Sequence, residues 1–336
     1  MSTPYLCPLT RQPLQERADG LVDAGGKHYP FLQGPGSCNP IPVFIDAELV
    51  SGGDAISQAM YRKVDAEVFY ENFLSWLYRT FDVNEQDFRN SLVDKLALRP
   101  GARVLVTGCG LGDDIPCILD RIGPDGAVFA QDISDIMVAA TARRLHTGPD
   151  SIADGRNVYL SVSNASLLPY PDRYFDAAFH FGGINLFSDM KAAIDEMARV
   201  VKVGGKVVIG DEGVAPWLKE QEYGKIAINN NRLWGLDAPL ALLPSTASDA
   251  HLSWVLGNCF YLIDFAVSDE LPYMNIDVPH EGMRGGSMRK RYFGQLEGID
   301  PAIKAQLASA AAEAGTSVSA WLEQAIAKAL ADGTQK

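Results

Sequence analysis

The stretch VLVTGCGLGDD, residues 104–114, sets the interpretation of the whole chain. Three apolar residues and a threonine run into glycines at positions 108, 110 and 112, and two aspartates follow. A buried strand that ends in such a turn brings backbone close to a ligand, because glycine has no Cβ and tolerates positive φ. In a parallel α/β sheet, ligands bind beside the carboxyl ends of the strands. The glycines alone leave three possibilities open: a dinucleotide site, a nucleoside-cofactor site, or only a tight turn.

Strand and helix patterns alternate around this stretch, which predicts an α/β, doubly wound, Rossmann-like sheet with helices on both faces. Less regular sequence at 213–260 is expected to be a substrate-side insertion, and a strand-like pattern returns at 259–267. Helical spacing of apolar residues precedes the sheet at 57–98. The clearest later helix is expected at 190–201, and the strands are expected at 103–107, 127–131, 158–162, 175–180 and 205–210.

The composition narrows the class of partner. The chain has 336 residues and a formal net charge of −13, so it has no overall attraction for nucleic acid or an anionic membrane. It contains no apolar run long enough to span a bilayer and no N-terminal signal pattern. Five scattered cysteines indicate reduced thiols rather than a disulfide framework. We therefore expect a cytoplasmic protein that acts on a small molecule.

The second predicted strand ends in Asp132, twenty residues after the last glycine of the turn. A carboxylate there can accept hydrogen bonds from both ribose hydroxyls of an adenosine. The glycine order differs from the dinucleotide fingerprint G-x-G-x-x-G, and Asp113 and Asp114 would be unfavourable beside a pyrophosphate. A nicotinamide dehydrogenase is therefore disfavoured, whereas a cofactor with an ammonium and a sulfonium group is compatible with the turn.

Four blocks, in this order and spacing, resemble a class I S-adenosylmethionine-dependent methyltransferase of the ubiquinone/menaquinone-biosynthesis type. The resemblance covers roughly residues 60 to 212 and implies S-adenosyl-L-methionine as the cofactor. The blocks are VLVTGCGLGDD (104–114), VFAQDIS (128–134), SNASLLPYPDRYFDAAF (163–179) and IDEMARVVKVGGKVVIGDE (194–212).

The resemblance assigns cofactor-binding roles to individual residues. It implies that Asp132 holds the ribose, that Ile133 lies against the adenine, and that His180 faces the methyl donor. Asn164 and Ala165 would meet the adenine edge. The amino acid part would be lined by the turn, namely Thr107, Gly108, Cys109, Gly110, Gly112 and Asp113.

The chain departs from the family pattern at two positions. Val106 stands where an acidic residue is common, so a contact to the cofactor's amino group is either missing or supplied by Asp113. Asn164 stands where Asp is common, and its carbonyl can still accept a hydrogen bond from the adenine amine.

The catalytic candidates are His180, Asp211 and Glu212, which end the fourth and fifth predicted strands. A general base is needed only when the methyl acceptor carries a proton, and His180 is the best candidate for that role. Asp211 and Glu212 are candidates for binding a cationic substrate or for acting as a base. The sequence does not identify the acceptor, and oxygen, nitrogen, carbon and sulfur all remain open.

The N-terminal part, residues 1–50, is expected to be a small β-rich module. It resembles the zinc-ribbon-like domain found on or beside some tRNA and rRNA methyltransferases. That domain uses four cysteines, of which only Cys7 matches, and Thr10 stands where its C-x-x-C partner would be. Tetrahedral zinc needs four ligands, so we predict no metal in this module.

The C-terminal part, residues 284–332, follows a methyltransferase domain expected at 57–280. A strand is expected from Arg291 to Glu297, followed by a helix at 301–314 and a second helix from Thr316 or Ser317. The order resembles the ribbon-helix-helix fold, an intertwined dimer, and we expect homodimerisation through this segment.

Three functions follow from these observations. The favoured one is a small-molecule methyltransferase that works by in-line displacement and forms a homodimer. One alternative is an RNA methyltransferase, suggested by the N-terminal resemblance and the basic stretch RGGSMRKRYF at 284–293. The other is a regulator that binds S-adenosylmethionine and uses the C-terminal segment on DNA, which the departures at Val106 and Asn164 keep open. The acidity of the chain and the missing cysteines argue against nucleic acid as a partner.

Overall fold

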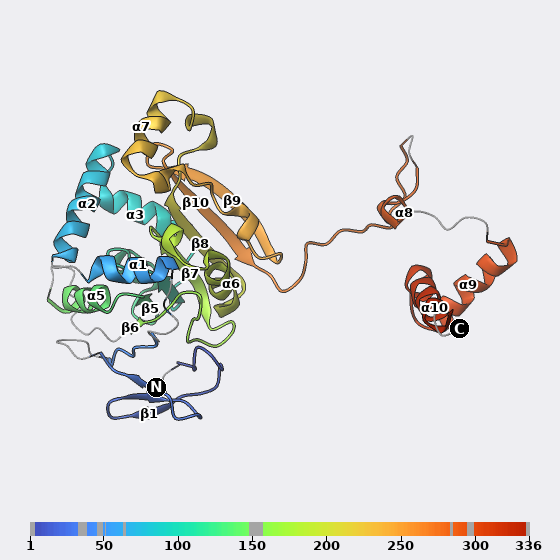
Figure 1. Ribbon diagram of the computed structural model, residues 1–336, viewed down its shortest axis with the longest axis horizontal. Helices are drawn as coiled ribbons and strands as arrows, with labels where there is room; N and C mark the ends of the chain where they lie inside the picture. The colour runs from blue at the N-terminus through green and yellow to red at the C-terminus, as the bar shows by residue number, and fades with distance from the viewer. Residues whose placement is uncertain are drawn as a thin grey trace. The chain divides into compact units, whose positions relative to one another are not determined.

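The computed structural model describes residues 4–32, 39–45, 50, 52–62, 65–147, 157–282, 285–293 and 299–333. The chain divides into two compact units, Met1–Pro272 and Tyr273–Lys336 (Figure 1). The first unit contains a seven-stranded sheet, and the second contains three helices among its described residues.

The central sheet has the strand order β6-β5-β4-β7-β8-β10-β9. The first five strands in this order pair in parallel, and β10 pairs antiparallel to β8 and β9. These strands confirm the predicted α/β sheet, but β9 lies inside the stretch that was expected to be irregular. The bounds are β4 (Arg103–Thr107), β5 (Ala127–Asp132), β6 (Val158–Val162), β7 (Phe175–Phe181), β8 (Val201–Glu212), β9 (Ala247–Val255) and β10 (Phe260–Val267).

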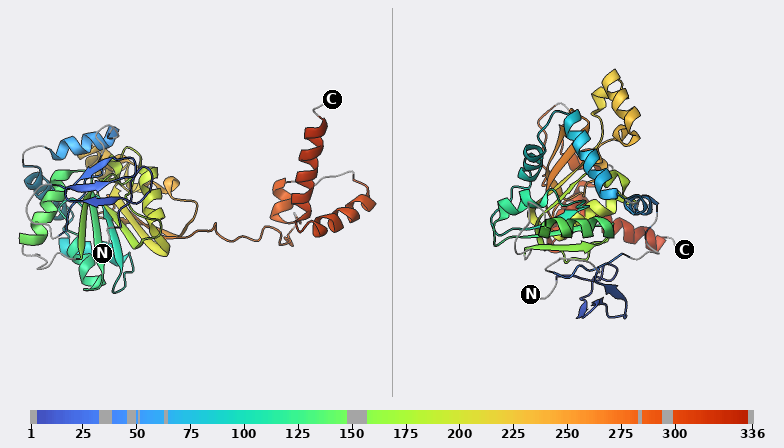
Figure 2. Two further views of the ribbon diagram at one scale, coloured as in Figure 1. Left: turned by 90° about the horizontal axis from the view of Figure 1, so that it is seen from below. Right: turned by 90° about the vertical axis from the view of Figure 1, so that its left-hand side faces the viewer.

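Helices cover both faces of the sheet (Figure 2). Alternate side chains of a strand point to opposite faces, so each strand packs against helices on both sides. Val104 and Val106 pack in one core cluster with residues of α3, α4 and α5, whereas Leu105 packs in the other with α6. The helices of the first unit are α1 (Gly52–Tyr61), α2 (Ala66–Thr80), α3 (Glu85–Asp94), α4 (Ile115–Ile122), α5 (Asp135–Thr147), α6 (Met190–Val200) and α7 (Glu222–Asn230), with short 3₁₀ turns η1 (Ile184–Leu186), η2 (Pro216–Leu218), η3 (Arg232–Gly235) and η4 (Leu240–Leu242).

The order of the strands places a ligand site between β4 and β7. From β4 the chain winds outward through β5 to β6, and then returns to β7 on the other side of β4. The connections after β4 and β7 therefore diverge, which leaves a crevice outside the carboxyl ends of these strands. The glycine turn follows β4 directly, and His180 lies near the end of β7.

The N-terminal residues of the first unit form a small antiparallel sheet of β1 (Gln15–Arg17), β2 (Gly20–Val22) and β3 (His28–Pro30). Its flanking chain extends the edge of the central sheet at Val162, which donates a hydrogen bond to the Pro42 carbonyl and accepts one from the Phe44 amide. Cys7 is buried, with Sγ 3.3 Å from the Tyr29 hydroxyl. Within the described residues, no group of three or more His, Cys, Asp or Glu side chains is arranged to hold a metal.

The second unit contains α8 (Met288–Phe293), α9 (Pro301–Glu313) and α10 (Val318–Gly333). The predicted strand at 291–297 is wrong for Arg291–Phe293, which belongs to α8, and residues 294–298 lie outside the described part. The Ser287 hydroxyl accepts a hydrogen bond from the Lys290 amide, an N-terminal cap that favours a helical turn over an extended chain. Asp300 caps α9 by accepting the Ala302 amide at 2.7 Å, with Pro301 in the first turn as predicted.

Candidate functional site

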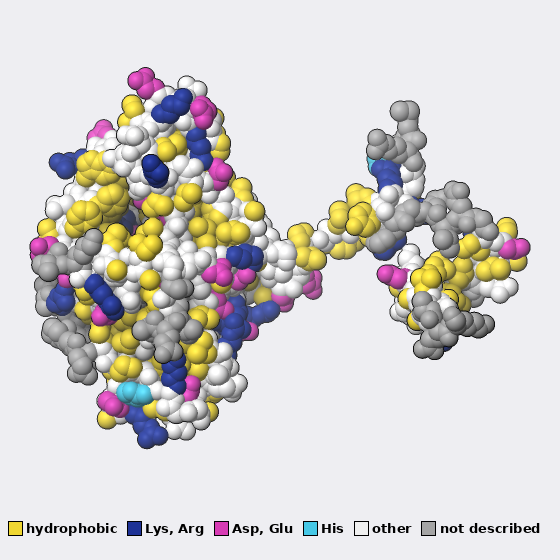
Figure 3. Space-filling view, viewed as in Figure 1, with side chains coloured by type: hydrophobic (Ala, Val, Ile, Leu, Met, Phe, Trp, Pro, Cys, Tyr) yellow, Lys and Arg dark blue, Asp and Glu magenta, His cyan; other side chains and the backbone are white. Residues whose placement is uncertain are grey.

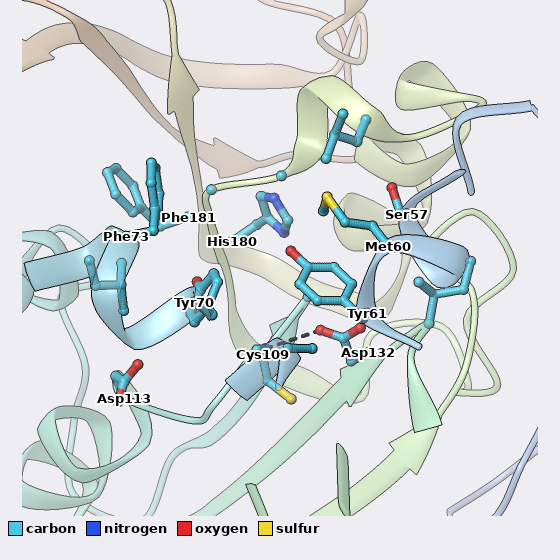
Figure 4. Close-up of a pocket in the computed structure, with 18 of the residues that line it drawn as sticks. Ser57, Met60, Tyr61, Tyr70, Phe73, Cys109, Asp113, Asp132, His180 and Phe181 are labelled. Atoms are coloured by element: carbon cyan, nitrogen blue, oxygen red, sulfur yellow. Dashed lines mark hydrogen bonds between the residues drawn. The ribbon is translucent and has the colours of Figure 1, made fainter. Parts of the chain in front are cut away.

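A cavity of about 840 Å³ lies at the carboxyl edge of the central sheet. Its floor comes from the ends of β4, β5, β7 and β8, and residues of α1 and α2 line it from the other side (Figure 4). Ten of the predicted site residues line it: Gly108, Cys109, Gly110, Asp113, Asp132, Ile133, Asn164, Ala165, His180 and Glu212. The other three, Thr107, Gly112 and Asp211, lie outside its lining.

The glycine turn uses its glycines in different ways. Gly108 and Gly110 line the cavity with φ values of 59° and 55°, a region that side chains with a Cβ adopt at a cost. A Cβ at Gly112 would lie 2.7 Å from the Thr141 methyl group of α5. The third glycine therefore allows the turn to pack against α5, and the first two line the cavity without a side chain of their own.

Asp132 ends β5 and reaches the same cavity. Its Oδ2 accepts a hydrogen bond from the Gly110 amide at 3.0 Å, and its Oδ1 accepts one from the Ser134 amide at 2.9 Å. Burial raises the pKa of this carboxyl to about 6, so it is ionised at neutral pH. A carboxylate has about four acceptor positions, so Asp132 keeps acceptor capacity for a ligand beside its backbone donors.

Asp113 and Asp114 are paired with arginines. The buried guanidinium of Arg89, on α3, lies 2.9 Å from Asp114 Oδ1 and 3.4 Å from Asp113 Oδ2. Arg144, on α5, lies 2.9 Å from Asp113 Oδ1. These ion pairs hold the start of α4 against its neighbours, and the cofactor contact assigned to Asp113 stays a prediction.

His180 is fully buried, and its ring nitrogens differ in their surroundings. Nδ1 lies 2.8 Å from the Thr107 carbonyl oxygen, which can only accept, so Nδ1 carries the hydrogen. Nε2 then presents a lone pair, and it has no hydrogen-bond partner among the described residues. Burial lowers the pKa of His180 despite the opposing charge of Asp211. The neutral ring therefore offers an unoccupied base at the cavity wall.

The two carboxyl groups at the end of β8 have separate environments. Asp211 is fully buried and accepts the amides of Asn185 at 2.7 Å and Glu212 at 2.8 Å, an arrangement that fixes local backbone. Glu212 lines the cavity, and burial together with the charge of Asp211 raises its pKa to about 9. At neutral pH Glu212 is a neutral acid that can donate a hydrogen bond.

The end of the cavity beyond Asp132 is lined by Ile133, Asn164 and Ala165. The Asn164 side chain already has two partners: Oδ1 accepts the Ser166 amide at 2.8 Å, and Nδ2 donates to Asp54 Oδ2 at 3.0 Å. Asp54 comes from α1 and was missed from sequence, because nothing in its local pattern separates it from a solvated helix-start carboxylate.

The other end of the cavity is apolar and aromatic. The rings of Phe181 and Phe260 stack with centroids 5.9 Å apart, and Phe73 and Leu233 line the same cavity with the polar Asn231. Tyr61 and Tyr70 stand nearer Asp132 and Cys109, with their rings toward the cavity (Figure 4). These residues were also missed, since aromatic residues at helical spacing are more often core than site.

Comparison with known proteins matches the central part of the chain. Residues 81–215 match the model of the ubiE/COQ5 methyltransferase family. The ubiquinone/menaquinone biosynthesis C-methyltransferase UbiE of Bordetella avium (strain 197N) is 36% identical over 118 residues, which cover 35% of this chain and 43% of that protein. The protein of the same name from Xanthomonas campestris pv. campestris (strain ATCC 33913 / DSM 3586 / NCPPB 528 / LMG 568 / P 25) is 37% identical over 124 residues, covering 36% and 47%.

The chain thus spans less than half the length of these curated relatives. Among solved structures, Haemonchus contortus phosphoethanolamine N-methyltransferase 2 in complex with S-adenosyl-L-methionine is 15% identical, with a TM-score of 0.48 and coverage of 69% of this chain and 62% of that one. The family match and the relatives show that the central segment, residues 81–215, is similar to C-methyltransferases of the ubiE/COQ5 family. The family match does not reach the N-terminal module or the second unit.

Proposed function

We propose that this chain transfers the methyl group of S-adenosylmethionine to a small-molecule acceptor by in-line displacement. The observation that carries the proposal is the meeting of the Asp132 carboxylate with the glycine turn at Gly108 and Gly110 in one cavity. A volume of about 840 Å³ lies in the range of small-molecule and cofactor sites. It leaves room for an acceptor beside the cofactor.

The residues present fit the cofactor in chemistry as well as in space. Asp132 keeps acceptor positions for ribose hydroxyls, and Ile133 and Ala165 provide apolar surfaces for a flat base. The buried Nε2 of His180 has no protein partner among the described residues, so a ligand or a water would satisfy it. Bound S-adenosylmethionine would supply a methyl group that is already electrophilic.

The protein's own contribution is to orient the acceptor and move a proton. The aromatic end around Phe181 and Phe260 would hold an apolar acceptor and exclude water. Positioning of this kind can contribute about 7–11 kcal/mol to lowering a barrier. His180 Nε2 would take a proton from the methyl acceptor. The neutral Glu212 would donate a hydrogen bond to the same acceptor molecule. The acceptor atom stays open.

We also propose that the protein is a homodimer through its second unit and that nucleic acid is not its partner. On the face shown in Figure 3, basic and acidic side chains of the first unit are interspersed, which does not favour a phosphate backbone. Among the described residues, no helix combines the length and apolar character needed to cross a bilayer. A salt-dependent shift with RNA or DNA would favour the alternative functions.

Calorimetric titration with S-adenosylhomocysteine tests the proposal. We expect micromolar binding by the wild type and at least a tenfold loss in Asp132→Ala, since a charge-assisted hydrogen bond is worth about 1.5–3 kcal/mol. Asp125→Ala is the matched control, because Asp125 is an exposed residue just before the same strand. Absence of binding by the wild type would overturn the proposal.

A further inference from the structure

Helix α1 lies outside the segment that matches the methyltransferase family, yet it is fixed to the cavity. Its Asp54 amide donates to Ser188 Oγ at 3.0 Å, and the Ser188 amide donates to Asp54 Oδ1 at 3.0 Å. Gln58 Nε2 donates to the Ile133 carbonyl at 3.2 Å. At Gly53 an added Cβ would lie 2.1 Å from the Leu186 carbonyl oxygen. The start of the helix is therefore held at backbone distance from η1.

This attachment points two polar side chains of α1 at the same end of the cavity. Asp54 and Ser57 lie one turn apart, both line the cavity, and their exposed fractions are only 7% and 8%. Figure 4 shows Ser57 on the same helix as Met60 and Tyr61, at the side of the cavity where Asp132 lies. Residues three apart share a helix face, so this face belongs to the binding site.

Ser57 and Asp54 have hydrogen-bonding capacity that the protein leaves unused. Ser57 Oγ is buried and has no hydrogen-bond partner among the described residues, which is costly unless a ligand or water supplies one. Asp54 Oδ1 accepts from Ser188 and Oδ2 from Asn164, so each oxygen keeps a second acceptor position.

The neighbours of this pair define the ligand that fits. Ile133 and Ala165 are apolar and suit the faces of a flat ring, and Asn164 is already bonded through both atoms of its amide. The acceptor positions of Asp54 call for an N–H donor, and the Ser57 hydroxyl can donate to a ring nitrogen. A nucleobase with an exocyclic amine and unprotonated ring nitrogens meets both demands.

We propose that Asp54 and Ser57 recognise the nucleobase of the cofactor, with the Asp54 carboxylate accepting a hydrogen bond from the exocyclic amine of adenine and Ser57 bonding to a ring nitrogen. The inference rests on the proposed function. It makes Asp54 a specificity-determining residue for an amine-bearing base, beside the Asn164 amide, whose Oδ1 already accepts the Ser166 amide.

The test compares S-adenosylhomocysteine with its analogue that has hydrogen in place of the 6-amino group. Calorimetric titration of the wild type should give at least about tenfold weaker binding of the analogue, because the carboxylate would face no donor. In Asp54→Ala this preference should fall to less than about threefold. Ser57→Ala should weaken both ligands alike, since both keep the ring nitrogens.

Ser188→Ala is the matched control. It removes the hydroxyl that accepts the Asp54 amide but leaves the carboxylate, so the ratio between the two ligands should stay at the wild-type value. If Asp54→Ala does not fold or binds neither ligand, Asp54→Leu decides, because it has a similar shape but no acceptor, and it should also lower the ratio.

Two results would overturn the inference. One is a wild type that binds both ligands equally, and the other is a foldable Asp54 variant that keeps the wild-type ratio. Failure of the wild type to bind S-adenosylhomocysteine would instead refute the proposed function on which the inference rests.

Discussion

The affinity for S-adenosylhomocysteine should depend on pH through Asp132. This carboxyl is buried at the end of β5, and burial raises its pKa to about 6. Both of its oxygens already accept backbone amides, from Gly110 at 3.0 Å and Ser134 at 2.9 Å. Protonation converts one acceptor position into a donor, so the acid no longer has a free acceptor for each ribose hydroxyl. We therefore expect binding to require the ionised form.

The magnitude follows from the ionised fraction. With a pKa of about 6, roughly nine-tenths of the carboxyl is ionised at pH 7 and roughly one-tenth at pH 5, so the affinity should fall about tenfold between them. The effect on the unliganded fold has the opposite sign. Between pH 3.8 and about 6 the folded carboxyl still holds a proton that the unfolded one has already lost. The stability of the unliganded protein therefore falls as pH rises through that interval.

Calorimetric titration at pH 5, 6 and 7, at constant ionic strength, measures this dependence. Asp132→Asn should bind more weakly and show no dependence on pH in that range. His180 is another titratable group of this cavity whose pKa burial shifts, in its case downward, and His180→Gln serves as the control that should keep the wild-type slope. Equal wild-type affinity at pH 5 and pH 7, or an unchanged slope in Asp132→Asn, would refute the reasoning.

Three further predictions concern the walls of the cavity. His180→Gln should lower turnover of an acceptor that must lose a proton by about 10²–10⁴-fold, measured with radiolabelled methyl donor, while an acceptor that needs no base should be little affected. Arg89→Met should lower the free energy of unfolding in urea by about 3–5 kcal/mol, because it leaves the Asp114 carboxylate without its buried cation, whereas Asp113 keeps Arg144. A loss below about 1 kcal/mol would contradict this. In the folded protein the pKa of Glu212 is raised from 4.5 to about 9, so the wild type should lose stability relative to Glu212→Gln as pH rises through that interval. Urea unfolding at pH 5, 7 and 9 measures this difference. A difference in unfolding free energy that stays constant over the three pH values would contradict the prediction.

The sheet and its ligand edge could be predicted because their signals are local. The buried strand β4 is an apolar run, and the turn after it needs positive φ at Gly108 and Gly110, which selects glycine. Asp132 could be placed because it ends the next strand, and neighbouring parallel strands end at one edge. A sequence window of a few residues contains each of these signals.

The rest of the site depends on contacts between distant parts of the chain. Asp113 lines the cavity as expected, but its ion pairs with Arg89 and Arg144, on two different helices, could not be predicted. Ser57 and Asp54 enter the cavity only because α1 docks on η1, and no local pattern encodes that docking. The error at Arg291 has a related cause: an apolar and basic run is compatible with a strand or a helix, and the cap at Ser287 selects the helix.

The cavity is built partly from residues outside the segment that matches the relatives, so the relatives do not identify the methyl acceptor. The turn and Asp132, which would hold the cofactor, lie inside the matched segment 81–215. The aromatic end is built largely from outside it, with Phe73 on α2, Leu233 on η3 and Phe260 on β10. Acceptor specificity comes from groups that contact the acceptor, so similarity in the cofactor half does not transfer the relatives' acceptor to this chain. A screen should therefore follow the chemistry of this end, an apolar aromatic wall with one base and one neutral acid, rather than the relatives' names.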